Sequence, residues 1–163
     1  MVEFSKIVEF KNLLAQLDLL RDESKQIGLC HGCFDLVHFG HVLHFQEAKK
    51  SCDVLLCSVT CDKHVNKGPN RPFFTLDRRL IVLAEMNSIN FVVASEFATA
   101  KAVIDLVKPD VYFKGGDYAD YNQFPGLLEE KTYVEKNGGR LVITTSDQSS
   151  STYVHEKLRE ELR

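Results

Sequence analysis

The sequence has 163 residues, of which 44% are hydrophobic and 26% charged, and its 20 basic and 23 acidic side chains give a formal net charge of −3. This length predicts one domain, residues 1–163, with residues 1–24 as an N-terminal helix packed on it. The charge balance argues against a nucleic-acid-binding protein. No apolar run approaches the roughly 20 residues of a membrane span and the N-terminus has no signal-peptide pattern, so we expect a cytoplasmic protein that does not enter a membrane.

Helical and extended patterns alternate along the chain. The extended segments are continuous apolar runs, which are typical of parallel strands covered on both faces. We expect strands over 27–30, 53–59, 90–94, 110–113 and 140–144, and helices over 7–20, 38–51, 99–108 and 126–137 and after residues 75 and 152. This alternation predicts an α/β fold of the Rossmann-like type, a three-layer α/β/α sandwich around a parallel five-stranded sheet.

The first strand runs into Gly32 and a short loop, and a helix then opens with His38 and His41. Such a junction lies at the carboxyl ends of parallel strands, where the helix turns its free N–H groups and positive dipole end toward a ligand. This arrangement is typical of phosphate binding. Two imidazoles three residues apart share a face and can donate to one oligophosphate, and Gly40 between them leaves room for close approach. A packed or capping histidine is the alternative.

The cysteines are clustered in one third of the sequence, at Cys30, Cys33, Cys52, Cys57 and Cys61. An odd number of clustered cysteines is a poor disulfide framework, so we expect reduced thiols. The Cys30-x-x-Cys33 pair beside histidines suggests a zinc or redox site as an alternative, but no second ligand pair follows at the required spacing. We therefore expect no metal ion held by the protein's own side chains.

A polar segment over 61–73 follows the second strand. It is long for a connection in a compact domain, and such loops usually carry function. Its basic residues Lys63 and Lys67 lie at the same edge of the sheet as the histidine pair and suit the capture of phosphate groups. A solvated loop with incidental lysines is the alternative.

Two further strand-to-helix junctions carry polar residues. The fourth strand ends in Lys114, Gly115, Gly116 and Asp117, where the glycines would let the backbone pass close to a ligand and the carboxylate would accept hydrogen bonds from sugar hydroxyls. A plain turn would also explain the glycines. The hydroxyl cluster at 149–152 precedes the last helix and forms either a helix cap or a second phosphate cradle.

Several motifs together resemble those of the cytidylyltransferase-like nucleotidyltransferases. His38-Phe39-Gly40-His41, after Gly32-Cys33-Phe34-Asp35, resembles the His-x-Gly-His signature of that family. Further matching motifs, in the family's order, are Lys67-Gly68 before Arg71-Pro72, Leu76-Asp77-Arg78-Arg79, Lys114-Gly115-Gly116-Asp117-Tyr118 and Ser150-Ser151-Thr152. The resemblance covers almost the whole chain and is greatest to the adenylyltransferases that make ADP-heptose from heptose 1-phosphate. The chain departs from the pattern at Gln148, where relatives commonly have glycine.

The resemblance implies that a phosphate oxygen of an acceptor attacks the α-phosphorus of a nucleoside triphosphate and that pyrophosphate leaves. The catalytic residues that it implies are His38, His41, Lys67 and Arg79, the last two neutralising developing charge. The nucleotide-binding residues that it implies are Gly32, Cys33, Phe34, Gly40, Gly115, Ser150, Ser151 and Thr152. The implied acceptor-binding residues are Asp35, Lys114 and Asp117, with orientation of the phosphate loop as the alternative for Asp35. Mg²⁺ is expected with the triphosphate, and a phosphorylated sugar as the acceptor.

Other interpretations stay open at this point. Nothing in the phosphate-binding motifs reads the base, so a cytidylyltransferase that uses CTP and makes a CDP-activated polyol or amino-alcohol is one alternative. Residues 145–148 read Thr-Ser-Asp-Gln where glycerol-phosphate relatives typically carry Arg-Thr-Glu-Gly, which favours the sugar subgroup. A non-catalytic nucleotide-binding module is the second alternative. We also expect a homodimer, covering apolar surface of Phe73, Phe74 and the first helix.

Overall fold

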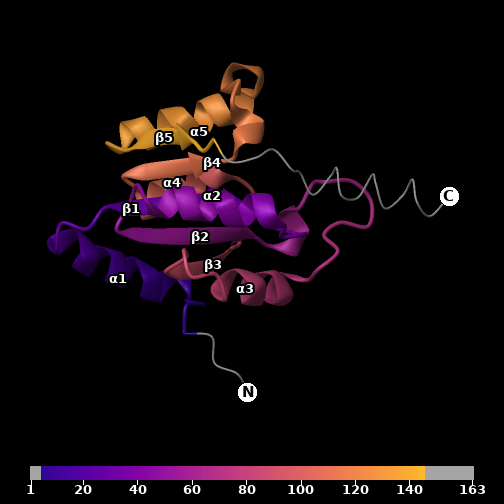
Figure 1. Ribbon diagram of the computed structural model, residues 1–163, viewed down its shortest axis with the longest axis horizontal. Helices are drawn as coiled ribbons and strands as arrows, with labels where there is room; N and C mark the ends of the chain where they lie inside the picture. Colours follow the sequence, from indigo (N-terminus) through magenta and orange to yellow (C-terminus); the bar gives the residue numbers. More distant parts are fainter. Residues whose placement is uncertain (1–4, 146–163) are drawn as a thin grey trace.

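The computed structural model describes residues 5–145, which form a parallel five-stranded sheet between two layers of helices (Figure 1). The strands are β1 (Ile27–Gly32), β2 (Val54–Thr60), β3 (Phe91–Ser95), β4 (Val111–Lys114) and β5 (Arg140–Ile143). The α-helices are α1 (Phe10–Asp22), α2 (Phe39–Lys49), α3 (Leu76–Ala84), α4 (Ala100–Val107) and α5 (Pro125–Lys136). Three short 3₁₀ turns are η1 (Asp62–His64), η2 (Gly116–Tyr118) and η3 (Tyr121–Gln123). The predicted three-layer α/β class is confirmed.

The strand order β3-β2-β1-β4-β5 places a change of direction at the centre of the sheet. From β1 the chain proceeds outward through β2 to β3, and then returns to the other side of β1 to add β4 and β5. The connection from β1 to α2 and the connection from β4 to η2 therefore start at neighbouring strand ends and run in opposite directions. In open α/β sheets the crevice outside such a switch point is where ligands bind.

Two apolar clusters, one on each face of the sheet, hold the layers together. On one face Leu17 of α1, Val103 of α4 and Val134 of α5 pack at 0% exposure with the inward side chains of the strands. On the other face Phe45 of α2 and Leu83 of α3 do the same. Because both faces are covered, the strands carry the continuous apolar runs seen in the sequence.

The main departure from the sequence-based prediction is at the start of the chain. The apolar stripe predicted a helix from residue 7, but Ile7 forms a parallel bridge with Val92 and α1 begins at Phe10. Val8 N–H donates to Val92 O at 3.0 Å, and Val92 N–H donates to Lys6 O at 2.8 Å. The segment thereby covers the edge of β3, whose unpaired backbone groups outweigh the helical preference of these few residues.

Two glycines form the turn between α5 and β5. Gly138 has a positive φ of 83°. Gly139 is required for a different reason, since a Cβ there would lie 2.1 Å from Pro109 O. The turn into β5 therefore needs one glycine for its conformation and the other for a close backbone approach.

Candidate functional site

The corner between β1 and α2 is built around a strained residue. Phe34 adopts φ 49°, a left-handed conformation that is unfavourable for a bulky side chain and is retained only where packing enforces it. Its ring is buried, 5.4 Å from the ring of Phe45 and 5.7 Å from that of His41, and a Cβ at Gly32 would lie 3.1 Å from it. The aromatic packing thus fixes the backbone of Cys33 and Phe34 at the predicted phosphate loop.

The two histidines expected to bind phosphate lie side by side at the start of α2. His38 is the N-cap residue and His41 the third residue of the helix, with their ring centroids 4.0 Å apart. The His38 backbone N–H donates to Nδ1 of His41 at 3.3 Å, so the neutral His41 ring carries its proton on Nε2. Gly40, between them, is buried in the first turn of the helix. The structure therefore brings the two imidazoles together at the start of α2, where they also form a capping box and the His41 N–H donates to His38 O at 3.0 Å, so the capping alternative applies beside the phosphate-binding one.

Both imidazoles are held in the neutral form at pH 7. Burial lowers the pKa of His41 to about 3, with smaller contributions from the neighbouring His38 and His44 imidazoles and from the ammonium group of Lys67. Burial also lowers the pKa of His38, against the opposing charge of Asp117. A neutral imidazole with one N–H acts as a hydrogen-bond donor to phosphate, with no need to gain or lose a proton during the reaction.

Asp35 is used inside the protein, so its predicted role as a ligand of the acceptor has no support in its contacts. Its side chain is 0% exposed; Oδ2 accepts from Nε of Arg71 at 2.7 Å and Oδ1 accepts from the N–H of Phe74 at 3.0 Å. Both bonds tie the loop before α3 to the phosphate loop. The alternative reading, that this carboxylate orients the phosphate loop, matches what the structure shows.

Arg79 is likewise a brace, and this corrects its expected position facing the substrate. The residue is 1% exposed and its guanidinium donates to Cys33 O, to Thr60 O at 2.8 Å, and to Asp62 Oδ1 at 2.6 Å. The Nε donates to Phe74 O at 3.0 Å. One side chain therefore holds together the phosphate loop, the end of β2 and the start of α3. Arg79 acts on the site by keeping these elements in place.

The loop at 61–73 is exposed in its middle, over residues 66–70, and is anchored toward α3 by the buried side chain of Arg71. Lys67 is exposed, and its charge lies near enough to His41 to help lower its pKa and near enough to Cys33 to oppose the rise in pKa that burial causes there. Lys63 pairs instead with Glu96 at 2.7 Å on the surface. The loop, which projects past the sheet toward the right of Figure 1, thus places one of its two candidate lysines beside the histidines.

The end of β4 forms the other wall of the site. Lys114 is 12% exposed at its side chain and pairs with Glu130 at 2.9 Å. Among the described residues other than its two chain neighbours, no heavy atom lies within 4 Å of the position that a Cβ of Gly115 would take, so its backbone borders open space in this part of the chain. Asp117 is exposed and lies near enough to raise the pKa of His38. The structure therefore brings the predicted acceptor residues of this motif to the edge of the phosphate corner.

Buried polar side chains connect both walls beneath the site. Cys30 Sγ contacts Nε2 of His44 at 3.3 Å, Nδ1 of His44 contacts Oγ1 of Thr144 at 2.8 Å, and that hydroxyl contacts Lys114 O at 3.3 Å. These bonds join β1, α2, β4 and the end of β5. Burial lowers the pKa of His44 to about 4, so its imidazole is neutral.

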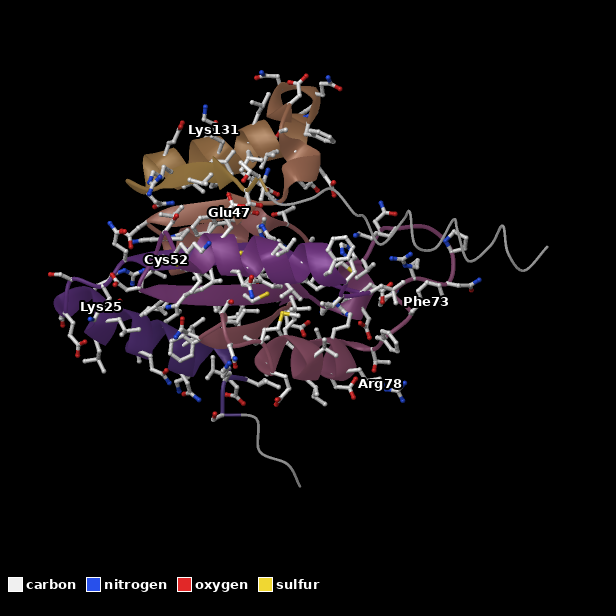
Figure 2. All side chains as sticks on the ribbon, in the orientation of Figure 1. Lys25, Glu47, Cys52, Phe73, Arg78 and Lys131 are labelled. Carbon is white, nitrogen blue, oxygen red and sulfur yellow. The ribbon has the colours of Figure 1, made fainter. Side chains whose placement is uncertain are left out.

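Glu47 of α2 holds the chain just beyond β5. It accepts two bonds from the N–H of Thr145, at 3.0 Å to each carboxylate oxygen, and one from its hydroxyl at 3.2 Å. Figure 2 shows Glu47 on the side of α2 that faces the end of β5. Ser150, Ser151 and Thr152, the predicted second phosphate cradle, lie outside the described residues.

The cysteines are buried or packed as free thiols. Burial raises the pKa of the Cys30 thiol well above its ordinary value and also raises that of Cys33, which disfavours the thiolate that zinc binding and redox exchange need. Over residues 5–145, no group of three or more His, Cys, Asp and Glu side chains is placed to hold a metal ion. The zinc and redox alternatives therefore have no geometric support in this part of the chain.

Sequence reasoning missed several polar side chains of the site. His44 continues the three-residue spacing of His38 and His41, a pattern that could have marked it as facing the same side of α2. Arg71 stands out in the sequence only as part of a motif, with no signal that its side chain is buried against Asp35. Glu130 lies in a helix with many charged residues, and no sequence signal separates it from its exposed neighbour Glu129.

A phosphate corner at the switch point of a parallel sheet, with neutral imidazole donors and a flanking lysine, defines a nucleotide-binding α/β protein of the nucleotidyltransferase class. Comparison with known sequences agrees: the cytidylyltransferase-like family profile matches residues 29–157. The chain belongs to the cytidylyltransferase-like family. It is a nucleotidyltransferase, as the resemblance of its motifs predicted.

Curated relatives carry the name Bifunctional protein HldE. That of Pseudomonas entomophila is 35% identical over 156 residues, 94% of this chain and 32% of the relative, and that of Alcanivorax borkumensis is 36% identical over 151 residues, 91% of this chain and 31% of the relative. The chain thus spans about a third of the length of these relatives.

Two solved structures share the fold. A lipopolysaccharide core biosynthesis protein from Thermoplasma volcanium has a TM-score of 0.63 at 23% identity, covering 76% of this chain and 99% of its own. Pantothenate synthetase from Thermus thermophilus has a TM-score of 0.67 at 16% identity, covering 96% of this chain and 70% of its own. In the described part of the chain, no helix has the length and apolar character needed to cross a membrane.

Proposed function

We propose that this nucleotidyltransferase transfers AMP from ATP to a sugar phosphate of the heptose 1-phosphate type, releasing pyrophosphate and giving a nucleotide-activated sugar. The observation that carries the proposal is the pair of neutral imidazoles, 4.0 Å apart, at the start of α2 beside the end of β4. The heptose assignment is supported by the motif resemblance and by the similarity to proteins named HldE.

In the proposed reaction a phosphate oxygen of the acceptor attacks the α-phosphorus in line, an oxygen–phosphorus bond forms, and the bond to the β-phosphate breaks. His41 Nε2–H and the His38 imidazole donate hydrogen bonds to the triphosphate oxygens. The N–H groups of the corner at Cys33 and Phe34 face the α-phosphate, and Lys67 neutralises charge that moves onto pyrophosphate. Positioning and electrostatic stabilisation carry this step, so no covalent intermediate is needed.

Arg79 and Asp35 take part in this scheme as positioning residues. Arg79 holds the carbonyl of Cys33, and Asp35 holds Arg71 and Phe74, so the phosphate loop keeps its shape when the charged triphosphate arrives. A site whose dipoles are fixed in advance does not spend binding energy on reorganisation. Ser150, Ser151 and Thr152 stay part of the proposal as ligands of the β- and γ-phosphates.

Mg²⁺ is proposed to arrive with the triphosphate. This ion keeps several waters and binds through substrate phosphates with few protein carboxylates, so it does not require a cage of protein ligands, and residues 5–145 contain none. When bound it neutralises phosphate charge. The exposed Asp117 is the carboxylate of the site's rim that is positioned for an outer contact with a bound water.

The test of the proposed function is pyrophosphate release by the purified protein with ATP, CTP, GTP or UTP against a panel of sugar 1-phosphates and polyol phosphates. We expect turnover with ATP and a heptose or hexose 1-phosphate. Turnover with CTP and glycerol or amino-alcohol phosphates alone would replace the proposal by the cytidylyltransferase alternative. Nucleotide binding without turnover on any acceptor would support the non-catalytic module.

We also propose that the protein forms a homodimer. Large apolar side chains are exposed on the loop before α3 and on α1, among them Phe73 at 48%, Phe74 at 43% and Leu19 at 66%. Figure 2 shows Phe73 on the stretch of the loop that returns to α3. Sedimentation equilibrium at micromolar concentration should give twice the mass of the chain, and a monomer at high micromolar concentration would remove this proposal.

A further inference from the structure

We propose that the sugar of the acceptor binds in a cavity between the end of β4 and the start of α5, where aromatic, amide and carboxylate side chains recognise a polyhydroxylated ring. This inference rests on the proposed function and assigns a place to one part of its substrate. It adds Tyr118 of η2, Gln123 of η3 and residues of α5 to Lys114 and Asp117, which the motif resemblance already implied as acceptor-binding residues.

The cavity has a volume of about 310 Å³ and is lined by Lys114, Tyr118, Gln123, Phe124 and Glu130 together with the first residues of α5. Small-molecule pockets have volumes from about 300 Å³ upward, so this one suits a ligand the size of a single phosphorylated sugar. Its lining combines two aromatic rings with a cation, an anion and an amide. That mixture matches a sugar, whose C–H faces are apolar and whose hydroxyls both donate and accept.

The carboxylate of Glu130 is prepared to bind hydroxyl groups. Its Oε2 accepts from Lys114 Nζ at 2.9 Å and from the Tyr112 hydroxyl at 2.9 Å, and both bonds hold the side chain in one orientation. Among the described residues no hydrogen bond reaches the other oxygen, Oε1. A carboxylate oxygen at the wall of a cavity, fixed by its partner oxygen, is an acceptor for a sugar hydroxyl.

The aromatic pair offers a ligand one ring face. The rings of Tyr118 and Phe124 meet edge to face, with centroids 5.0 Å apart and planes at 61°. A sugar needs only one aromatic face for its C–H groups, and because a nucleobase could stack on the same face, it is the charged groups of Lys114 and Glu130 in the lining that favour a phosphorylated sugar. Phe124 is 39% exposed, so its ring is not buried in the core and is accessible to a ligand.

The cavity connects to the phosphate corner through Lys114. This residue ends β4 next to β1, where Cys30 pairs with Phe113, and its charge contributes to the low pKa of His31 and His44. Glu130 occupies one of the three N–H donors of its ammonium group. The remaining donors would hold the acceptor phosphate at the inner end of the cavity, facing the α-phosphate that the histidines position.

The test uses Phe124→Ala and Gln123→Ala, two exposed positions whose substitution leaves the core intact, and Glu130→Gln, which keeps an oxygen and the length of the side chain. We expect each to raise the KM for the sugar phosphate about tenfold. The kcat and the Kd for ATP, measured by calorimetry without acceptor, should stay within about twofold. The matched controls are Glu129→Gln and Leu128→Ala on the same helix, which lie outside the cavity and should change nothing.

The outcomes separate this inference from the proposed function. If the wild-type protein turns over a sugar phosphate and the three variants keep its KM, the cavity does not bind the sugar, while the function stands. A loss of ATP affinity in the variants would make the cavity a nucleobase site and overturn the inference. If the wild-type protein uses no sugar phosphate but is active on another acceptor, the proposed function is wrong, and the inference that rests on it is wrong as well.

Discussion

Two parts of the loop between β2 and α3, its exposed middle and its buried end, use the same kind of side chain in opposite ways. At its far end Arg71 is 8% exposed and bound to Asp35, while near its middle Lys67 is exposed beside the histidines. Arg79, just after the loop, is even more buried. A basic residue at this edge of the sheet therefore either holds the phosphate corner in shape, as Arg71 and Arg79 do, or is exposed where it can contact a phosphate, as Lys67 is. Burial and protein oxygen partners decide which, since a guanidinium that donates to protein oxygens has those donors no longer available to a phosphate.

Removal of the histidine donors should have the largest effect on activity. His38→Ala and His41→Ala are each expected to lower kcat about 10²- to 10³-fold, because each removes a positioned donor from the developing charge. Pyrophosphate release measures the rate, and thermal unfolding checks that the fold persists. His64→Ala is the matched control, since this histidine contacts Glu96 O at 2.9 Å and not the site. Equal rates for the wild type and a folded His38→Ala, His41→Ala double variant would remove both residues from the mechanism.

The buried end of the loop should matter next, and through stability. Asp35→Ala leaves the Arg71 guanidinium buried without its ion-pair partner, a change that typically costs about 3–5 kcal/mol. Urea unfolding measures this loss in the free energy of unfolding. The surface pair of Lys63 and Glu96 is the comparison, and Lys63→Ala should leave stability nearly unchanged. If both substitutions had the same small effect, the buried end would not be a structural anchor.

Much of this fold was readable from the sequence because its signals are local. Continuous apolar runs identified every strand, and the His38, Gly40 and His41 pattern identified the corner. What could not be read depends on distant partners. Arg79 looks like any basic residue near a helix start until Cys33 O and Thr60 O are found around it. In the same way nothing local shows that Glu130, and not Glu129, reaches Lys114.

The buried histidines beneath and beside the site should make the protein sensitive to acid. The pKa values of His31 and His41 are lowered to about 3 and that of His44 to about 4, mainly by burial. Between about pH 6.5 and pH 4 the unfolded chain therefore binds more protons than the folded chain, and the free energy of unfolding falls as the pH falls. The slope is up to about 1.4 kcal/mol per pH unit for each histidine.

Urea titrations from pH 7 to pH 5 measure this dependence above the range where most carboxylates titrate. His44→Asn should be less stable at pH 7, because its bonds to Cys30 and Thr144 are disturbed, but its stability should fall less steeply with decreasing pH. A variant with an unchanged slope would show that His44 does not lose a proton on folding.

Substitutions in the exposed middle of the loop should have the smallest effect on the protein without ligand and a clear effect when ligand is bound. Residues 66–70 are all exposed, so the segment has few contacts that would protect its amides from exchange. When a triphosphate binds at the histidines, Lys67 can exchange water for a phosphate oxygen, and a charge-assisted bond of this kind typically contributes about tenfold. Lys67→Ala should then lower ATP affinity and kcat together, while Lys63→Ala should lower neither. Hydrogen exchange of residues 63–71 with and without ATP decides the matter, because equal protection in both states would leave Lys67 a surface charge with no part in the reaction.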